Sequence, residues 1–555
     1  MKKLINDPRD LVRELLEGTV DLSPGLALLD SENVVLRADL PAPGGRKVAV
    51  ISGGGSGHEP AHAGYVGRGM LTAAVAGDVF TSPSTDAVLA AILAAAGPAG
   101  ALLIVKNYTG DRLNFGLAAE LARQQGIPVE VVVVADDVAL RDLVARDRRR
   151  GIAGTVLVHK LAGAAAQRGL PLSEVAAIAR DAAGRLGSMG VALGACIVPA
   201  AGKPGFELGA GEIEFGLGIH GEKGVERTAL RSAEEIVAAL LDTILADLAP
   251  AAGAPVALLV NGLGATPPME LAVVAREALA GLRQRGLTVE RAWCGNFMTA
   301  IEMPGVSLTV LPLSGGDGEL LDDPSDAPAW PGNGRIGRQR TLIAAPQASA
   351  PRPAQPGPLT QDLRRVALAV AAALETAEAE LTDLDARAGD GDLGASMARA
   401  AAAIRALPAD SHASPARLLF DLGNALRRAI GGSSGPFYAT ALLRAAAALE
   451  DEPRPRGEQW LAALEAGTQA IVDLGGARPG DRTMVDALAP AVHAWRKSGR
   501  FADGVAAARA GAQATAGMHP ALGRAAYLGQ RAVGTPDGGA VAVAIWMEAL
   551  EQTLA

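Results

Sequence analysis

The chain has 555 residues, which is too long for one ordinary domain and ample for several hydrophobic cores. Hydrophobic residues make up 49% and charged residues 20%, a composition typical of folded globular proteins. The formal net charge of −9 argues against a nucleic-acid-binding surface, because such a surface needs clustered Lys and Arg to neutralise phosphates.

Cysteine usage and hydropathy point to the compartment. Only Cys196 and Cys294 are present, so a disulfide framework is excluded and a reducing compartment is expected. The opening residues MKKLINDPRD carry no apolar segment of a signal peptide. No apolar run approaches the ~18 residues of a membrane-spanning helix. We therefore expect a soluble cytoplasmic protein.

The first half alternates short apolar, β-branched runs with longer Ala/Leu-rich stretches. This alternation predicts an α/β fold with a largely parallel sheet. Three later runs continue the pattern and suggest a second α/β lobe that begins near residue 190. The predicted strands are 47–52, 101–107, 129–136 and 155–160, followed by 191–198, 255–262 and 306–313.

The pattern changes after a proline-rich segment. Residues 345–359 contain five prolines among small and polar residues, which is typical of a semi-extended linker. Beyond it the sequence reads as one helix after another, with no convincing strand. We therefore predict three parts: an α/β part of two lobes at 1–340, a linker at 341–359 and an all-helical domain at 360–555.

A glycine-rich segment, GGGSGHEP at 53–60, directly follows the first predicted strand. Glycines there let the backbone approach a small ligand, although a plain tight turn explains a bare glycine cluster equally well. His58 and Glu59 favour the ligand-binding interpretation. HEPAH also matches the H-E-x-x-H pattern of zinc peptidases, but Pro60 would start the helix after His58, so a metallohydrolase is the weaker alternative.

Two further segments carry polar side chains after apolar strands. In KNYTGD, Lys106 and Asp111 lie where parallel sheets bind ligands, although Asp111 could instead cap a helix. In EIEFGLGIHGEKG, His220 stands among glycines, where a histidine is more often an exposed loop residue than a catalyst.

The strongest chemical signal lies in LTDLDARAGDGDLGASM at 381–397. Asp385, Asp390 and Asp392 offer hard oxygen ligands from one tight loop, which suits Mg²⁺ bridging phosphate oxygens. An EF-hand loop does not match the spacing. Glycine-rich turns at 430–438 and 476–488 open further helices, whose N-termini can bind phosphate. These features predict a nucleotide site in the helical domain.

Taken together, these segments resemble the ATP-dependent dihydroxyacetone kinase family in its single-chain form. The resemblance covers nearly the whole chain. The matching segments are SGGGSGHEP, FTSPSTD, KNYTGD, ALGACIVPAAGKP and EFGLGIHGE in the first half, and LDARAGDGD, GGSSGP, RPGDRTMVDAL and GRAAYLG in the second.

The resemblance implies a two-lobed α/β substrate part, a helical-barrel nucleotide domain and a role for each motif. His220 would attack the ketone carbonyl to form a covalent hemiaminal, and Asp111, aided by His58, would accept the proton of the reacting hydroxyl. The implied substrate-binding residues are Gly55, Ser56, Gly57, His58, Lys106 and Asp111. The implied ligands of two Mg²⁺ ions are Asp385, Asp390 and Asp392. The implied ATP contacts are Leu393, Gly394, Ala395, Ser396, Ser433, Ser434, Gly475, Met484, Arg524 and Asp537.

Several functions stay open at this stage. Dihydroxyacetone is the expected substrate, and a four-carbon ketose such as erythrulose is the alternative. A triokinase-like enzyme that also uses glyceraldehyde or cyclises FAD is a further alternative. A phosphorelay or regulatory binding protein with fixed ADP belongs to a different class. Such relatives carry the substrate and nucleotide parts on separate chains. The resemblance also implies a homodimer.

Overall fold

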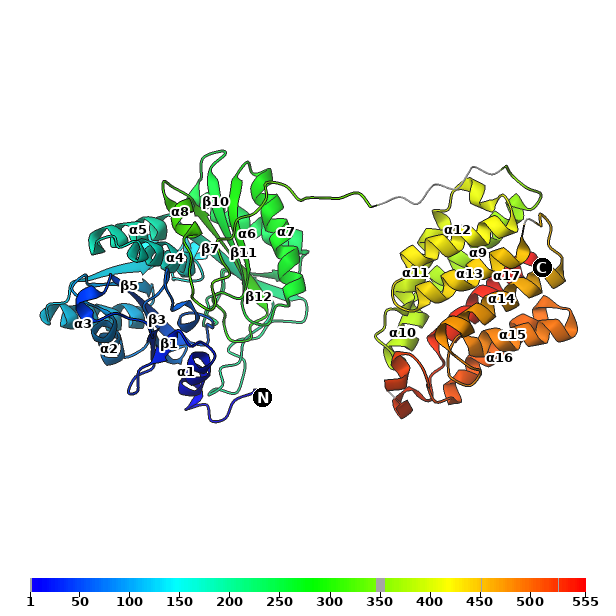
Figure 1. Cartoon of the computed structure of the whole chain (residues 1–555), viewed down its shortest axis with the longest axis horizontal. Helices are drawn as coiled ribbons and strands as arrows, with labels where there is room; N and C mark the ends of the chain where they lie inside the picture. Colours follow the sequence, from blue (N-terminus) through cyan, green and yellow to red (C-terminus); the bar gives the residue numbers. More distant parts are fainter. Residues whose placement is uncertain (1, 346–354, 451, 528) are drawn as a thin grey trace. The chain divides into compact units, whose positions relative to one another are not determined.

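The computed structural model describes residues 2–345, 355–450, 452–527 and 529–555. The chain divides into two compact units, Met1–Ile343 and Ala344–Ala555. Figure 1 shows sheets and helices in the first unit and helices alone in the second, as the sequence predicts. Much of the predicted linker, at 346–354, lies outside the described residues.

The first sheet comes from the N-terminal part of the first unit. In spatial order its strands are β1 (Leu26–Leu28), β2 (Val34–Arg37), β4 (Ala73–Val79), β3 (Ala49–Ser56), β5 (Ala101–Lys106) and β6 (Val129–Val134). Strands β3 to β6 are parallel, and β1 and β2 form an antiparallel edge. The carboxyl ends of β3 and β5 therefore lie at the same edge, where parallel sheets bind ligands.

The second sheet is mostly antiparallel, which differs from the predicted parallel pattern. Its spatial order is β11 (Thr288–Gly295), β10 (Pro255–Gly262), β12 (Gly305–Pro312), β7 (Gly187–Ala192), β8 (Glu212–Phe215) and β9 (Glu226–Ala229). Only β10 and β11 are parallel. Parallel pairing needs a crossover segment, and α7 (Pro268–Gln284) supplies one between these two strands alone.

Helices cover both sheets and join their cores. The first sheet has α2 (Thr85–Ala95) and α3 (Thr109–Gln124) on one face. Its other face packs on α1 (Leu11–Asp21), α4 (Thr155–Gln167) and α5 (Leu172–Arg185). The same core reaches the second sheet and α8 (Asp317–Asp322), while α6 (Ala233–Leu248) and α7 cover that sheet's far face. Helices α4 and α5 thus pack in the core that both sheets share.

The prediction of a strand at 155–160 is wrong, because these residues begin α4. Every residue of α4 from Thr155 to Ala166 is buried. A helix buried on all sides has no polar, solvent-facing side, so its sequence lacks the 3.6-residue periodicity that identifies surface helices. The short apolar run TVLV therefore imitates a buried strand.

Two other strand predictions are shifted. The segment predicted at 191–198 forms a strand only to Ala192, because β7 spans Gly187–Ala192. The first predicted strand, 47–52, continues as β3 through the three glycines to Ser56. The first part of the glycine-rich segment therefore belongs to a sheet strand that ends at Ser56.

The helical unit is a closed ring. Its elements are α9 (Thr360–Thr376), α10 (Glu378–Ala388), α11 (Leu393–Arg405), α12 (Pro415–Ala429), α13 (Ser434–Leu449), α14 (Gly457–Gly475), α15 (Val485–Ser498), α16 (Phe501–Ala514) and α17 (Gly538–Leu554). Starting at α9 and passing over α10, each helix packs on the next, and α17 returns to α9. Their apolar faces share one core.

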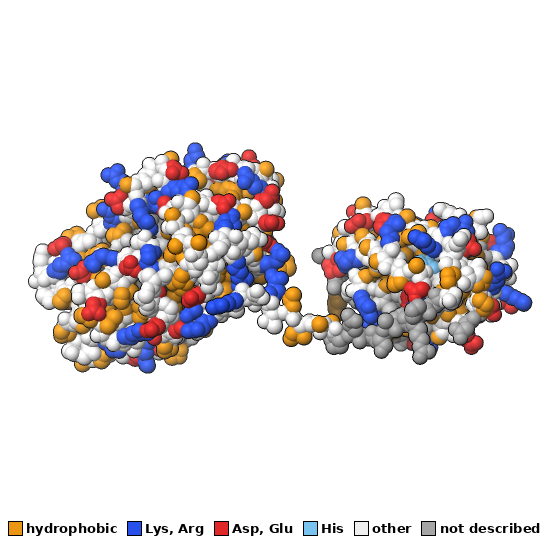
Figure 2. Space-filling view, turned by 90° about the horizontal axis from the view of Figure 1, so that it is seen from above, with side chains coloured by type: hydrophobic (Ala, Val, Ile, Leu, Met, Phe, Trp, Pro, Cys, Tyr) orange, Lys and Arg blue, Asp and Glu red, His pale blue; other side chains and the backbone are white. Residues whose placement is uncertain are grey.

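The surface is mixed in charge. Figure 2 shows Lys and Arg side chains interspersed with Asp and Glu on the visible face of each unit. Within the described part of the chain, none of the helices combines the length and the hydropathy needed to cross a membrane.

Candidate active site

The predicted ligand residues of the first unit gather at the carboxyl edge of the first sheet. Ser56 ends β3, Lys106 ends β5, and Asp111 lies in the first turn of α3. All three side chains are buried. Asp111 does not cap α3, because the N-cap position is Tyr108 and no side chain makes the capping bond. The helix-cap alternative for Asp111 is therefore wrong.

Gly54 is required by close packing against two of these side chains. Its φ is +155°, and a Cβ atom there would lie 2.8 Å from Lys106 Nζ and 3.7 Å from Asp111 Oδ2. Gly57 has φ +97°, and a Cβ atom there would lie 2.9 Å from the Phe80 ring. The glycines thus bring the backbone against the polar and aromatic groups of the site.

His58 is fully buried, and its tautomer follows from one hydrogen bond. Its Nδ1 lies 2.7 Å from the carbonyl oxygen of Thr299, which can only accept, so Nδ1 carries the proton. Nε2 is then a bare acceptor. Burial lowers the pKa of His58 well below its usual value, and the charge of Lys106 lowers it further. His58 is therefore neutral near pH 7.

His220 lies on the loop after β8, on the second sheet, and still meets residues of the first sheet. Its ring centroid is 4.9 Å from His58, 5.1 Å from Phe80 and 4.7 Å from Tyr108. His220 Nδ1 lies 2.9 Å from Glu222 Oε1, and the His220 backbone N–H donates to Glu222 Oε2 at 3.0 Å. The fold therefore assembles one histidine pair from the two sheets.

Glu222 is a site residue that the sequence reasoning missed. Burial would raise its pKa, but the hydrogen bond from His220 outweighs burial and lowers the pKa to about 2. The carboxylate is therefore ionised and accepts the Nδ1 proton, so that in the neutral tautomer of His220 the lone pair is on Nε2. The H-x-E spacing was visible in the sequence, but only the structure shows the contact.

Three polar atoms around the histidine pair need partners. Among the described residues, no group hydrogen-bonds to His58 Nε2, Lys106 Nζ or Asp111 Oδ1, although all three are buried. Burial lowers the pKa of Lys106, while the carboxylates of Asp111 and Glu222 oppose that shift. Buried polar atoms are normally satisfied, so this arrangement suits a small ligand with several hydroxyl or carbonyl groups.

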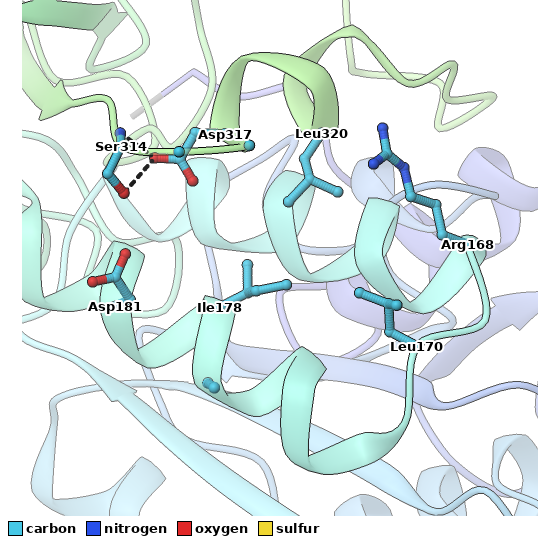
Figure 3. A pocket seen from close by; sticks show the side chains of 10 residues that line it. Arg168, Leu170, Ile178, Asp181, Ser314, Asp317 and Leu320 are labelled. Atoms are coloured by element: carbon cyan, nitrogen blue, oxygen red, sulfur yellow. Dashed lines mark hydrogen bonds between the residues drawn. The ribbon is translucent and has the colours of Figure 1, made fainter.

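A cavity of about 430 Å³ lies elsewhere, between α5 and the start of α8. Figure 3 shows Leu170, Ile178 and Leu320 at this cavity together with Asp181 and Asp317. None of the predicted site residues lines it, so we do not assign it to the ligand chemistry.

The three aspartates of the helical unit form one cluster. Oxygen atoms of Asp385, Asp390 and Asp392 all lie within 4.8 Å of one another. Asp385 lies in the last turn of α10, which ends at Ala388, and its Oδ2 accepts the backbone N–H groups of Asp392 at 2.9 Å and Leu393 at 3.3 Å. Three carboxylates this close repel unless cations are bound among them, and their hard oxygen atoms suit Mg²⁺.

Several predicted nucleotide residues surround this cluster at helix N-termini. Leu393, Met484 and Asp537 stand at the starts of α11, α15 and α17. A Cβ atom on Gly538 would lie 2.6 Å from Leu393, and one on Gly539 would lie 3.8 Å from Met484. These helix starts therefore converge beside the aspartates, and the positive ends of the helix dipoles favour phosphate.

The remaining predicted ATP contacts differ in their exposure and packing. Ser433 and Ser434 begin α13 and are at least partly exposed, and Ala395 is partly exposed in α11. Gly394 and Ser396 are buried, and a Cβ atom on Gly394 would collide with α10. Gly475 packs against the Phe437 ring at the end of α14. The side chain of Arg524 lies outside the described part of the chain.

Comparison with known proteins agrees with both units. Residues 17–329 match the Dak1 domain and residues 387–552 match the DAK2 domain. The chain is 44% identical to the Homo sapiens triokinase/FMN cyclase, over 100% of this chain and 99% of that protein. It is 37% identical to the D-erythrulose kinase of Mycolicibacterium smegmatis, over 98% and 97%.

A solved structure shows the same arrangement of elements. The dihydroxyacetone kinase of C. freundii, in complex with AMP-PNP and Mg²⁺, matches with a TM-score of 0.66 and 38% identity, over 99% of each chain. Fold and matched domains define a two-part kinase that joins an α/β ligand unit to a helical nucleotide unit. The chain belongs to the dihydroxyacetone kinase family.

Proposed function

We propose that this chain transfers the γ-phosphate of ATP to a terminal hydroxyl group of a short ketose, with dihydroxyacetone as the main substrate. The observation that carries the proposal is the histidine pair of the first unit. His58 and His220 are neighbours, and each has Nδ1 engaged and Nε2 bare. One Nε2 is then a nucleophile and the other an acceptor beside it.

His220 would hold the ketose covalently. Its Nε2 lone pair attacks the ketone carbon, and the carbonyl oxygen takes up a proton to complete the hemiaminal. The imidazole ring gains positive charge in this step, and the ionised Glu222 carboxylate on Nδ1 stabilises that charge. Glycerol has no carbonyl group, so the site selects ketoses over polyols.

The reacting hydroxyl group would lie among the buried polar atoms of the first sheet. Asp111 accepts its proton as it attacks the γ-phosphorus, and His58 Nε2 assists as a second acceptor. Lys106 supplies a positive charge beside them. The backbone at Gly55–Gly57 approaches the ligand because larger residues would collide with Phe80 and Thr81.

The helical unit would bind Mg²⁺ and ATP. Asp385, Asp390 and Asp392 would hold two Mg²⁺ ions, and the ions neutralise charge on the phosphates during transfer. The N-termini of α11, α13, α15 and α17 would contact the nucleotide, with Ser433, Ser434, Met484 and Asp537 nearest the phosphates.

Three alternative functions would use the same ketose-binding and nucleotide-binding residues. The relatives named for erythrulose and for triokinase favour tests with a four-carbon ketose, glyceraldehyde and FAD. A phosphorelay role needs a separate phosphate-donor protein. The presence of both units in one chain favours direct use of ATP. We also expect a cytoplasmic homodimer, which sedimentation of the purified protein and cell fractionation would test.

Steady-state assays with Mg-ATP decide among these functions. We expect the highest kcat/KM with dihydroxyacetone, lower values with erythrulose and glyceraldehyde, and none with glycerol. His220→Ala should abolish ketose phosphorylation while Mg-ATP affinity is retained. Inactivity of the wild-type chain towards every ketose, or transfer only when a phosphocarrier protein is added, would overturn the proposal.

A further inference from the structure

Two buried histidines beside the ketose site have no role in the chemistry above. His159 on α4 is fully buried, and His62 is 6% exposed. Their ring centroids lie 5.2 Å apart in an edge-to-face arrangement. All four ring nitrogens are buried and find no hydrogen-bond partner among the residues that the structure describes. Buried imidazoles without partners are rare, because each unsatisfied nitrogen costs stability.

The positive charge of Lys106 in the ketose site acts on both rings. Burial lowers the pKa of His62 well below its usual value, and the charge of Lys106 lowers it further. Burial lowers the pKa of His159 to about 3, again with a contribution from Lys106. Both rings are therefore neutral near pH 7, and each offers one N–H donor and one lone pair. The H-E-x-x-H zinc alternative gains no support, since residues 58–62 form a bend and turns and do not place the two histidines on one helical face.

A cavity of about 390 Å³ adjoins His62. It lies between α1 and the glycine-rich segment, and His62, Glu59 and Gly54 are among its lining residues. Gly54 is also the residue against which Lys106 Nζ packs. The cavity has room for several water molecules, and the unpaired nitrogens of His62 supply partners for them.

The proposed reaction creates a proton that must leave a buried place. The O–H bond of the ketose breaks, a bond from that oxygen to the γ-phosphorus forms, and the bond from phosphorus to ADP breaks. The hydroxyl proton passes to Asp111. Asp111 is 3% exposed, Lys106 is 1% exposed and His58 is not exposed. The two proton acceptors, Asp111 and His58, are therefore almost completely shielded from bulk solvent.

We propose that His62 and His159, together with water in the adjoining cavity, carry this proton from the ketose site to solvent. A neutral imidazole accepts a proton on one nitrogen as it gives up the proton of the other, so the pair moves a proton without storing charge. The inference rests on the proposed kinase function. It assigns the pair to proton exit, while ketose binding stays with His220.

The test separates proton release from phosphate transfer. Wild type, His62→Phe and His159→Phe are mixed with dihydroxyacetone and Mg-ATP in weakly buffered solution. Rapid quenching measures the ketose phosphate, and a pH-indicator dye measures the released proton. In wild type the two should rise together. In both variants the rate constant of proton release should be at least about threefold lower than the rate constant of ketose phosphate formation. Alternatively, phosphate transfer itself should slow and should show a larger solvent deuterium isotope effect than in wild type.

Controls distinguish this role from a structural one. His412→Phe changes another buried histidine, in the helical unit, and should leave both signals together. His62→Gln keeps a donor and an acceptor and should lag less than His62→Phe. In His62→Ala, added imidazole can enter through the cavity and should restore prompt proton release.

Two outcomes would refute the inference. If His62→Phe and His159→Phe lower only the melting temperature while proton and phosphate stay together at the wild-type rate, the pair is structural. If wild type forms no ketose phosphate at all, the proposed function itself fails.

Discussion

Replacement of Glu222 by glutamine tests whether its carboxylate sustains the nucleophile. The carboxylate accepts the His220 Nδ1 proton at 2.9 Å and holds the ring through the backbone N–H as well. Hydrogen bonds to charged groups contribute about 1.5–3 kcal/mol. The Glu222 side chain is 36% exposed, so solvent screening places the effect near the lower value. A loss of about 1.5 kcal/mol corresponds to roughly tenfold weaker ketose adduct formation.

Binding of dihydroxyacetone labelled with ¹³C at the carbonyl carbon measures this directly. In wild type the NMR signal of the bound carbon should be that of a saturated hemiaminal carbon. In Glu222→Gln, half-maximal adduct formation should require about tenfold more ketose. Glu226→Gln is the matched control, because Glu226 lies at the exposed start of β9 and pairs with Arg231. Equal adduct formation in Glu222→Gln and wild type would refute the role assigned to the carboxylate.

Three further changes test the rest of the site. Gly54→Ala places a methyl group 2.8 Å from Lys106 Nζ, at a backbone φ of +155°. The ketose affinity measured by calorimetry should therefore fall at least tenfold. Gly116→Ala is the control, because its methyl group would lie in open space and should not change the affinity. Asp385→Asn should weaken Mg-ATP binding at least tenfold in calorimetry and leave formation of the ketose adduct unchanged. If the variant formed less ketose adduct and bound Mg-ATP normally, the assignment of the two units would be reversed. Burial raises the pKa of Asp537 to about 6, so its contribution to stability is full below about pH 4 and is lost as the pH rises through 6. Asp537→Asn should therefore raise the melting temperature of the nucleotide-free protein at pH 7.5, with a smaller gain at pH 5. A gain that does not vary with pH would show that the carboxyl group does not titrate as stated.

The sequence determined the two-part architecture and the clustering of the three aspartates. Strands with strong β-branched patterns, such as β10 and β12, appear within one residue of their predicted positions. The spacing of Asp385, Asp390 and Asp392 suffices to predict a cluster, because a tight loop brings neighbours in sequence close in space. The run TVLVHK was misjudged because burial on all sides erases helical periodicity.

Only the tertiary structure decided what His220 can do. From the sequence it was a histidine among glycines, and its proposed role came from family resemblance alone. The fold brings it from the second sheet to His58 and Tyr108 on the first, and it places Glu222 on its Nδ1 atom. Contacts between residues more than 100 positions apart depend on how the two sheets pack around α4 and α5, which no local pattern records. The unpaired nitrogens of His62 and His159 are likewise a property of packing, visible only after the chain has folded.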